Sequence, residues 1–240
     1  MVALERNGHN VIDDDDVFRR FKIQYLSEIE PRPVEWEWKP LFARGKLSIL
    51  EGDPGVGKST LTMDFAATVS NGSKWPQTWV GADMMPRIES EPAGVILVGV
   101  EDDAADTVVP RLIAAGADRS RIARMARKTD DDGNPKPFVI PDDVDELRWL
   151  IRDASARLVI IDPITAFLST KMVKAGDDPS TRQALMPLVE LAENSGTAII
   201  MLRHWNKAVG MSAKHRGSGT IAYGGLARSV LAAAPYDPIT

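Results

Sequence analysis

The sequence predicts an α/β domain built on a mostly parallel sheet with helices on both faces. Apolar runs rich in valine and isoleucine alternate along the chain with stretches of helical spacing, which is the pattern of strand–helix–strand units. These runs are apolar at consecutive residues, as expected for strands that are covered on both sides. A glycine-rich loop follows the first run and leads into the first expected helix.

Five apolar runs are expected to form strands of this sheet. They are residues 46–51, 94–100, 157–163, 197–205 and 227–234. The segment 123–143 is expected to add a further strand next to an exposed turn. The long link 74–92 has no assigned chemical role and is expected to be a surface insertion or a subunit contact.

Helices are expected between the strands. Apolar residues recur every four positions after the glycine loop, and an Asn-Gly pair at 71–72 is expected to end that helix. Proline at 110 favours a short helix that stops at a glycine at 116. The residues expected to mark buried helix faces are Leu61, Phe65, Val69, Val144, Leu147, Ile151, Leu185, Leu188 and Ala192. Pro187 is expected to kink the last of these helices.

Composition limits the possible functions. The 240 residues carry a formal net charge of −5, so contact with nucleic acid would need a local basic patch. The chain has no cysteine, which excludes disulfides, cysteine–zinc sites and thiol catalysis. It shows no signal peptide and no apolar run long enough to span a membrane, so a cytoplasmic location is expected. Residues 1–34 are expected to be a polar, partly disordered tail, and residues 35–240 the folded domain.

The stretch EGDPGVGKST at 51–60 matches the phosphate-loop pattern G-x-x-x-x-G-K-S. Glycines allow successive backbone N–H groups to turn towards an anion, and the following helix points its positive end at the same place. The lysine is expected to reach the β- and γ-phosphates and the serine hydroxyl to bind Mg²⁺. The residues expected to bind ATP are Gly52, Asp53, Pro54, Gly55, Val56, Gly57, Lys58, Ser59 and Thr60.

Carboxylates follow two of the predicted strands. Asp162 ends one strand and is expected to be the acid on the magnesium side, together with Ser59. Glu101 follows another strand and is expected to be the base that orients the attacking water, with Asp102 as a possible substitute. Both strand ends should lie beside the phosphate loop at one edge of the sheet. His204 ends a third strand, where a polar residue is placed to sense the γ-phosphate.

These residues, in this order, resemble the RecA-like ATPases, and within them the RepA-like hexameric helicase branch of plasmids, phages and mobile elements. The resemblance rests on LSILEGDPGVGKSTL, VGVEDD, LVIIDPITAFL, ALMPLVELAENSGTAIIMLRHWNK and RGSGTIAYGGLARSV, which together cover most of residues 36–234. The glutamate after the second strand and the His-x-x-Lys after the fourth are typical of this branch. It implies Lys58, Glu101 and His204 as catalytic residues.

The resemblance also implies a homo-oligomeric ring, a hexamer, with ATP between neighbouring subunits. An arginine from the neighbour would complete each site; Arg228 matches best and Arg216 second. Such a finger neutralises charge that develops on the γ-phosphate. Two basic loops, with Lys171 and Lys174 in one and residues 207–216 in the other, would face the channel and bind single-stranded DNA.

Other functions remain open from the sequence. A regulatory or assembly ATPase that switches partners with nucleotide is favoured by the acidic composition. A recombinase or repair-type ATPase would require a filament-forming N-terminal element, and the polar tail shows no clear sign of one. A small-molecule kinase is less favoured, because no lid-like cluster of arginines stands out.

Overall fold

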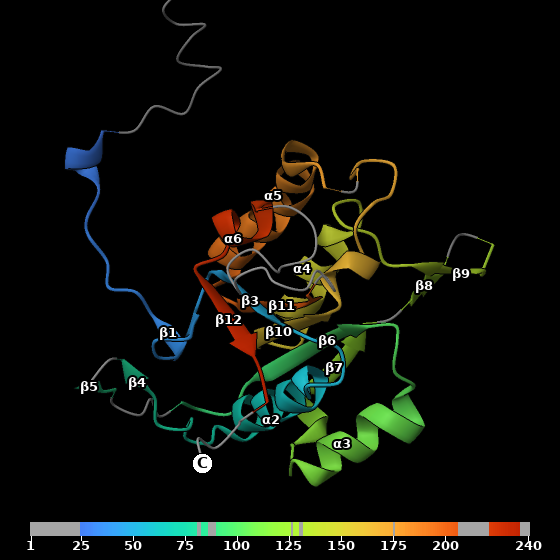
Figure 1. Cartoon of the computed structure of the whole chain (residues 1–240), viewed down its shortest axis with the longest axis horizontal. Coiled ribbons are helices and arrows are strands. Elements are labelled where there is room, and N and C mark those ends of the chain that lie inside the picture. Colours follow the sequence, from blue (N-terminus) through green and yellow to red (C-terminus); the bar gives the residue numbers. More distant parts are fainter. Residues whose placement is uncertain are drawn as a thin grey trace, which may run out of the picture. The chain divides into compact units, whose positions relative to one another are not determined.

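The structure, a computed structural model, describes residues 25–80, 83–85, 90–125, 127–129, 132–174, 176–205 and 221–235. The chain divides into two compact units, Met1–Pro33 and Val34–Thr240. The described part of the first unit contains one short helical turn, η1 (Leu26–Glu28). The second unit contains a six-stranded sheet and the helices that cover it (Figure 1).

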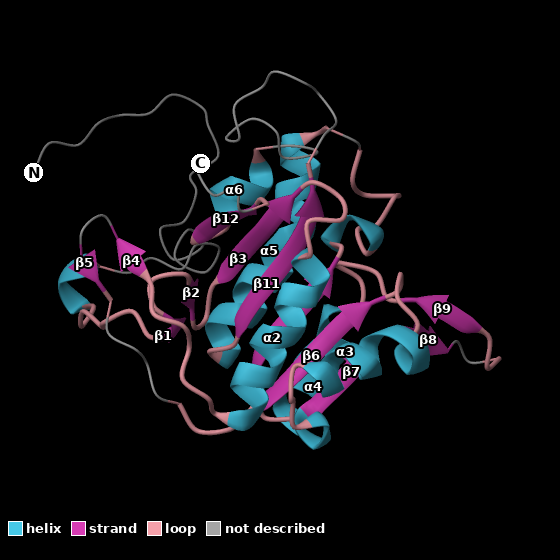
Figure 2. Ribbon diagram, turned by 60° about the horizontal axis from the view of Figure 1, so that its bottom comes forward, coloured by secondary structure: helices cyan, strands magenta, loops and turns pink. Residues whose placement is uncertain are grey.

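The central sheet is parallel throughout, in the order β12-β3-β11-β10-β6-β7. Its strands are β3 (Leu47–Gly52), β6 (Gly94–Gly99), β7 (Ile122–Met125), β10 (Ala156–Asp162), β11 (Ala198–His204) and β12 (Ser229–Ala233). Figure 2 shows these strands side by side with helices in front of them and behind them. The predicted α/β class with a mostly parallel sheet and helices on both faces is therefore confirmed.

The strand register brings the expected site residues to one edge of the sheet. His204 at the end of β11 pairs with Gly52 at the end of β3, where the glycine loop begins. Asp162 at the end of β10 pairs with Gly99 at the end of β6, just before Glu101. Because β11 and β10 are neighbours between β3 and β6, all four strand ends face the same side of the molecule.

Alternate residues of the strands point to opposite faces of the sheet and belong to two separate hydrophobic cores. One core contains Ile49, Val159 and Met201 and is covered by α4, α5 and α6. The other contains Leu50, Ile160 and Leu202 and is covered by α2 and α3. The α-helices are α2 (Lys58–Asn71), α3 (Val109–Ala114), α4 (Val144–Asp153), α5 (Asp178–Ser195) and α6 (Ala222–Leu226). Shorter turns are η2 (Ala104–Val108), which is π-helical, η3 (Arg119–Arg121) and η4 (Ile164–Ala166). No helix in the described ranges is long and apolar enough to cross a bilayer.

Helix α2 begins directly after the glycine loop and ends at Gly72, whose φ of 65° provides the left-handed cap. Phe65 and Val69 are buried as expected, but Leu61 is 40% exposed. The expectation for Leu61 was wrong because a step of four residues advances the helix by about 40° beyond a full turn. Two such steps carry Leu61 about 80° away from Val69.

Among the described residues, three small antiparallel strand pairs lie outside the sheet. They are β1 (Trp36–Trp38) with β2 (Phe42–Ala43), β4 (Trp79–Val80) with β5 (Asp83–Met84), and β8 (Arg127–Thr129) with β9 (Pro135–Pro137). The first hairpin supplies Trp38 and Phe42 to an aromatic cluster with Phe65 of α2 and Trp75. The two tryptophan rings stack at 4.8 Å, so this cluster fixes the segment that follows α2.

Candidate nucleotide site

The glycine loop has the backbone conformation of an anion-binding nest. Gly55 and Gly57 have φ angles of 82° and 87°, which favour glycine strongly. Gly57 is also the N-cap residue of α2 and offers no side chain to the first N–H groups of that helix. Those N–H groups therefore lack a side-chain cap at the place where the helix dipole favours an anion.

Lys58 is folded back into the loop. Its Nζ donates hydrogen bonds to the backbone oxygens of Gly52 at 3.0 Å and Asp53 at 2.9 Å. The same nitrogen lies 3.3 Å from Nδ1 of His204, which accepts a hydrogen bond when its proton is on Nε2. The structure thus brings the expected phosphate lysine and the expected sensor histidine into contact.

Ser59 and Asp162 also meet, although they are far apart in the sequence. Ser59 Oγ donates a hydrogen bond of 2.6 Å to Asp162 Oδ2. The contact joins the first turn of α2 to the end of β10, two strands away from β3. A hydroxyl and a carboxylate side by side at a phosphate loop are the donor set that P-loop proteins use for Mg²⁺.

Both charged groups of this site are held at an electrostatic cost. Burial lowers the pKa of Lys58, against the attraction of Asp162 and Asp53. Burial raises the pKa of Asp162, against the hydrogen bond from Ser59 and the attraction of His204 and Lys58. A polyphosphate would stabilise the charged lysine and a divalent cation the charged aspartate. The pair therefore fits a metal-bound nucleotide better than it fits either ion alone.

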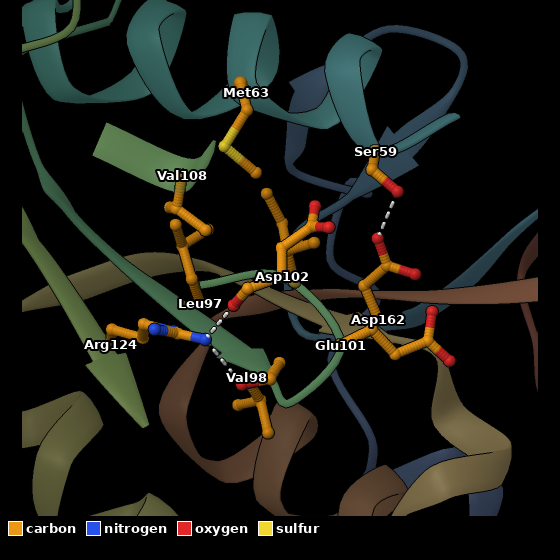
Figure 3. A pocket seen from close by; sticks show the side chains of 11 residues that line it. Ser59, Met63, Leu97, Val98, Glu101, Asp102, Val108, Arg124 and Asp162 are labelled. Carbon is orange, nitrogen blue, oxygen red and sulfur yellow. Dashed lines mark hydrogen bonds between the residues drawn. The ribbon is translucent and has the colours of Figure 1, made fainter. Parts of the chain in front are cut away.

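A cavity of about 80 Å³ lies beside Ser59 and Asp162 (Figure 3). Ser59, Asp162 and Glu101 line it at the sheet edge, while apolar side chains from α2, β6, η2 and β10 close it. Those apolar residues are Met63, Leu97, Val98, Val108 and Ile160. Glu101 is exposed, and its carboxylate has no hydrogen bond or ion pair with any other described residue. The cavity therefore brings together a carboxylate available for a water molecule and the serine–aspartate pair.

Two arginines that the sequence did not single out hold this region: Arg124 lines the cavity, and Arg111 binds Asp102, which also lines it. Arg124 on β7 donates from Nη2 to the backbone oxygens of Gly99 at 3.3 Å and Asp102 at 2.5 Å. Arg111 on α3 binds the Asp102 carboxylate at 2.6 Å. Asp102 is therefore engaged by arginines through its backbone and its side chain, which argues against the alternative in which it replaces Glu101. Strand alternation was the available signal: Ile122 joins the α2 core, so Arg124 faces the same side.

The remaining loop residues keep their positions around Lys58. Pro54 and Gly55 are exposed, Val56 is half-buried, and Thr60 is exposed in the first turn of α2. In the described part of the chain, no group of three or more His, Cys, Asp or Glu residues is arranged to hold a metal by itself. The donors present fit a cation that is shared with phosphate oxygens.

Of the two candidate finger arginines, the described one, Arg228, stands apart from the glycine loop of its own chain. Arg228 is exposed and precedes β12, and its backbone N–H donates to Leu47 O at 2.8 Å, at the start of β3. Since β3 runs from Leu47 to Gly52, about 17 Å of strand separates Arg228 from the glycine loop of its own chain. Arg216 lies outside the described residues, as do Lys207, Lys214 and His215.

The AAA_25 family, described as an AAA domain, matches residues 18–210. The chain belongs to this family. A DNA repair protein RadA from Brucella abortus (strain 2308) is 27% identical over 169 residues, which are 69% of this chain and 30% of that protein. The chain thus spans about 30% of the length of this curated relative.

A solved structure supports the same fold. The KaiC-like protein of Pyrococcus horikoshii OT3 superposes with a TM-score of 0.53 and 15% identity, over 83% of this chain and 81% of that one. Family and fold together make this AAA_25 protein a RecA-like P-loop ATPase, as its motifs indicated. These matches do not distinguish the RepA-like branch from other RecA-like ATPases.

Proposed function

We propose that this AAA_25 protein hydrolyses ATP with Mg²⁺ and uses the energy as a ring-forming motor on single-stranded DNA, as RepA-like helicases do. The observation that carries the proposal is the hydrogen bond between Ser59 and Asp162 next to the Lys58 loop. It joins a phosphate-binding loop to a metal-binding acid at one sheet edge. Bound Mg²⁺ would neutralise charge on the phosphates.

Each residue of the site has one role in the proposed reaction. Lys58 would bind the β- and γ-phosphates, and Ser59 and Asp162 would hold the cation. Glu101 accepts a hydrogen bond from the attacking water and takes its proton. His204, in contact with Lys58 at 3.3 Å, moves when the γ-phosphate leaves. The loop after β11 would then carry this change to DNA.

The place of Arg228 supports delivery of a finger from a neighbouring chain. It lies at the opposite end of β3 from its own glycine loop, so a role as a finger would require the loop of another copy. A head-to-tail contact of this kind closes into a ring when its rotation allows. Hydrolysis would therefore depend on assembly. Arg216 is the second candidate for the same role.

Mixing two inactive variants tests this proposal. Lys58→Ala should bind no nucleotide, and Arg228→Ala should bind nucleotide without turnover. In an equimolar mixture, about one quarter of the interfaces would combine an intact loop with an intact arginine, so ATPase activity should return to about that level. Lys46→Ala is the matched control, because Lys46 is a surface cation at the same sheet edge, paired with Glu193. No recovery in the mixture would exclude Arg228 as the finger.

DNA dependence separates the motor from the alternatives. Lys171 and Lys174 are exposed on the loop between β10 and α5, as a strand-binding loop requires. We expect single-stranded DNA to stimulate ATP hydrolysis strongly at low salt and weakly at moderate salt. ATPase activity that ignores DNA would support a nucleotide-switched regulatory protein instead.

The similarity to a DNA repair protein favours a second candidate, a recombinase or repair-type ATPase. A forked duplex with one labelled strand distinguishes the two. Release of the labelled strand supports the helicase. Strand exchange between homologous duplexes without release supports the repair-type ATPase.

A further inference from the structure

The loop that carries Glu101 is tied down on both sides of this residue by one side chain. The same nitrogen of Arg124, Nη2, donates to Gly99 O, two residues before Glu101, and to Asp102 O, one residue after it. A single planar donor group therefore closes the turn 99–102 around itself. Arginine suits this task because its guanidinium presents several donors in a fixed plane.

The side chains of Arg111 and Asp103 fix the end of the same loop. Arg111 from α3 binds the Asp102 carboxylate at 2.6 Å. Asp103 accepts hydrogen bonds from the backbone N–H groups of Ala105 at 2.7 Å and Asp106 at 3.2 Å, which caps the turn η2. The backbone around Glu101 is thus attached to β7, α3 and η2.

Glu101 itself has no such support. Its side chain is exposed and has no hydrogen bond or ion pair with another described residue. The point from which this side chain extends is therefore set by the backbone of 99–102, and that backbone is held by Arg124. Figure 3 shows Arg124 entering the cavity from the side opposite the Ser59–Asp162 pair, with the loop between them.

We propose that Arg124 is a positioning residue that sets the distance between Glu101 and the Ser59–Asp162 pair, and this inference rests on the proposed function. Arg124 does not need to touch the nucleotide. It holds the carboxylate where a water molecule in the cavity can be aligned with the γ-phosphate. A displacement of about 1 Å of such a group can reduce turnover about 100-fold.

The test compares Arg124→Gln, Arg124→Lys and the control Arg121→Gln. Arg121 lies three residues earlier, is bound to Asp118 at 3.1 Å and does not line the cavity. Its replacement by glutamine therefore removes the same charge at a place outside the cavity. We expect Arg124→Gln to lower kcat about 10- to 100-fold, with KM for ATP and the Kd for Mg·ADP within about twofold of wild type. Arg124→Lys keeps a charged donor but loses the fixed planar group, so it should recover only part of the lost rate. Arg121→Gln should behave as wild type.

Several results would overturn the inference. One is Arg124→Gln with unchanged kcat. Another is a loss of Mg·ADP affinity, or of folding by circular dichroism, that parallels the loss of rate, because that pattern marks a purely structural residue. A third is an equal loss in Arg121→Gln. If wild type and Lys58→Ala both lack ATPase activity, the proposed function itself fails. Wild-type turnover with a normal Arg124→Gln variant contradicts the positioning role alone.

Discussion

Gly52 is expected to tolerate no side chain, for a reason different from that of the other loop glycines. Its φ is not in the left-handed region, whereas Gly55 and Gly57 are there. A Cβ on Gly52 would instead lie within 3.0 Å of the backbone oxygen of Ala233 in β12, and 3.2 Å from Val56 Cγ2. Because real Cβ atoms do not approach so closely, β12 or the loop must move.

The size of the effect follows from these contacts. Overpacking of this kind costs about 1–3 kcal/mol of unfolding free energy. Gly99→Ala is the matched control, since Gly99 ends β6 at the same sheet edge and its Cβ would lie 3.6 Å from Asp162 O, an ordinary contact. Alanine in place of glycine in a strand stabilises by about 0.5–1 kcal/mol. Because this gain applies to both variants, it cancels, and the two should differ by about 1–3 kcal/mol.

Urea denaturation, followed by circular dichroism, measures this difference. Gly52→Ala should also weaken binding of Mg·ADP, because Gly52 O accepts hydrogen bonds from Lys58 Nζ at 3.0 Å and Trp205 N at 3.2 Å. Equal stability of Gly52→Ala and Gly99→Ala would refute the steric argument. So would a Gly52→Ala variant that binds Mg·ADP as tightly as wild type.

Two further substitutions test charges in the fold. Burial raises the pKa of Asp162 in the folded chain above its value in the unfolded chain. The folded chain therefore loses stability as pH rises from the unfolded-state pKa through the folded-state pKa. Near neutral pH, the free energy of unfolding of Asp162→Asn in urea should therefore equal or exceed that of wild type. Mg·ADP should not stabilise this variant further. An Asp162→Asn variant that is less stable than wild type would contradict the argument. Glu37 is fully buried and pairs with Arg44 at 3.0 Å and Arg157 at 3.3 Å. Glu37→Gln should cost about 3 kcal/mol in urea denaturation, and a loss under about 1 kcal/mol would argue against a structural role for this ion pair.

The sheet was predictable because its inner strands are continuous apolar runs. A strand buried on both faces shows this pattern whatever its neighbours, and the phosphate loop has a fixed spacing. The position of Asp162 beside the glycine loop was predictable because parallel strands bring their carboxyl ends to one edge. Its contact with Ser59 confirms that placement, and the roles of both residues stay proposals.

Other features depend on tertiary contacts that leave little trace in the sequence. The hairpin of Trp36–Trp38 with Phe42–Ala43 has strands of two and three residues, too short for a periodic pattern. Arg124 binds backbone oxygens. Because every residue type carries the same backbone oxygen, the sequence does not reveal which residues accept these hydrogen bonds. The direction of the Arg124 side chain follows from strand alternation, but its partners follow only from the loop that returns beside it.

Calorimetric titration of the whole chain with Mg·ADP is the most direct test of the nucleotide site formed by Lys58, Ser59 and Asp162. We expect saturable binding of one nucleotide per chain, weakened without Mg²⁺ and absent in Lys58→Ala. Absence of binding to wild type, or binding that is unchanged by Lys58→Ala and by removal of Mg²⁺, would contradict the assignment of this sheet edge as the nucleotide site.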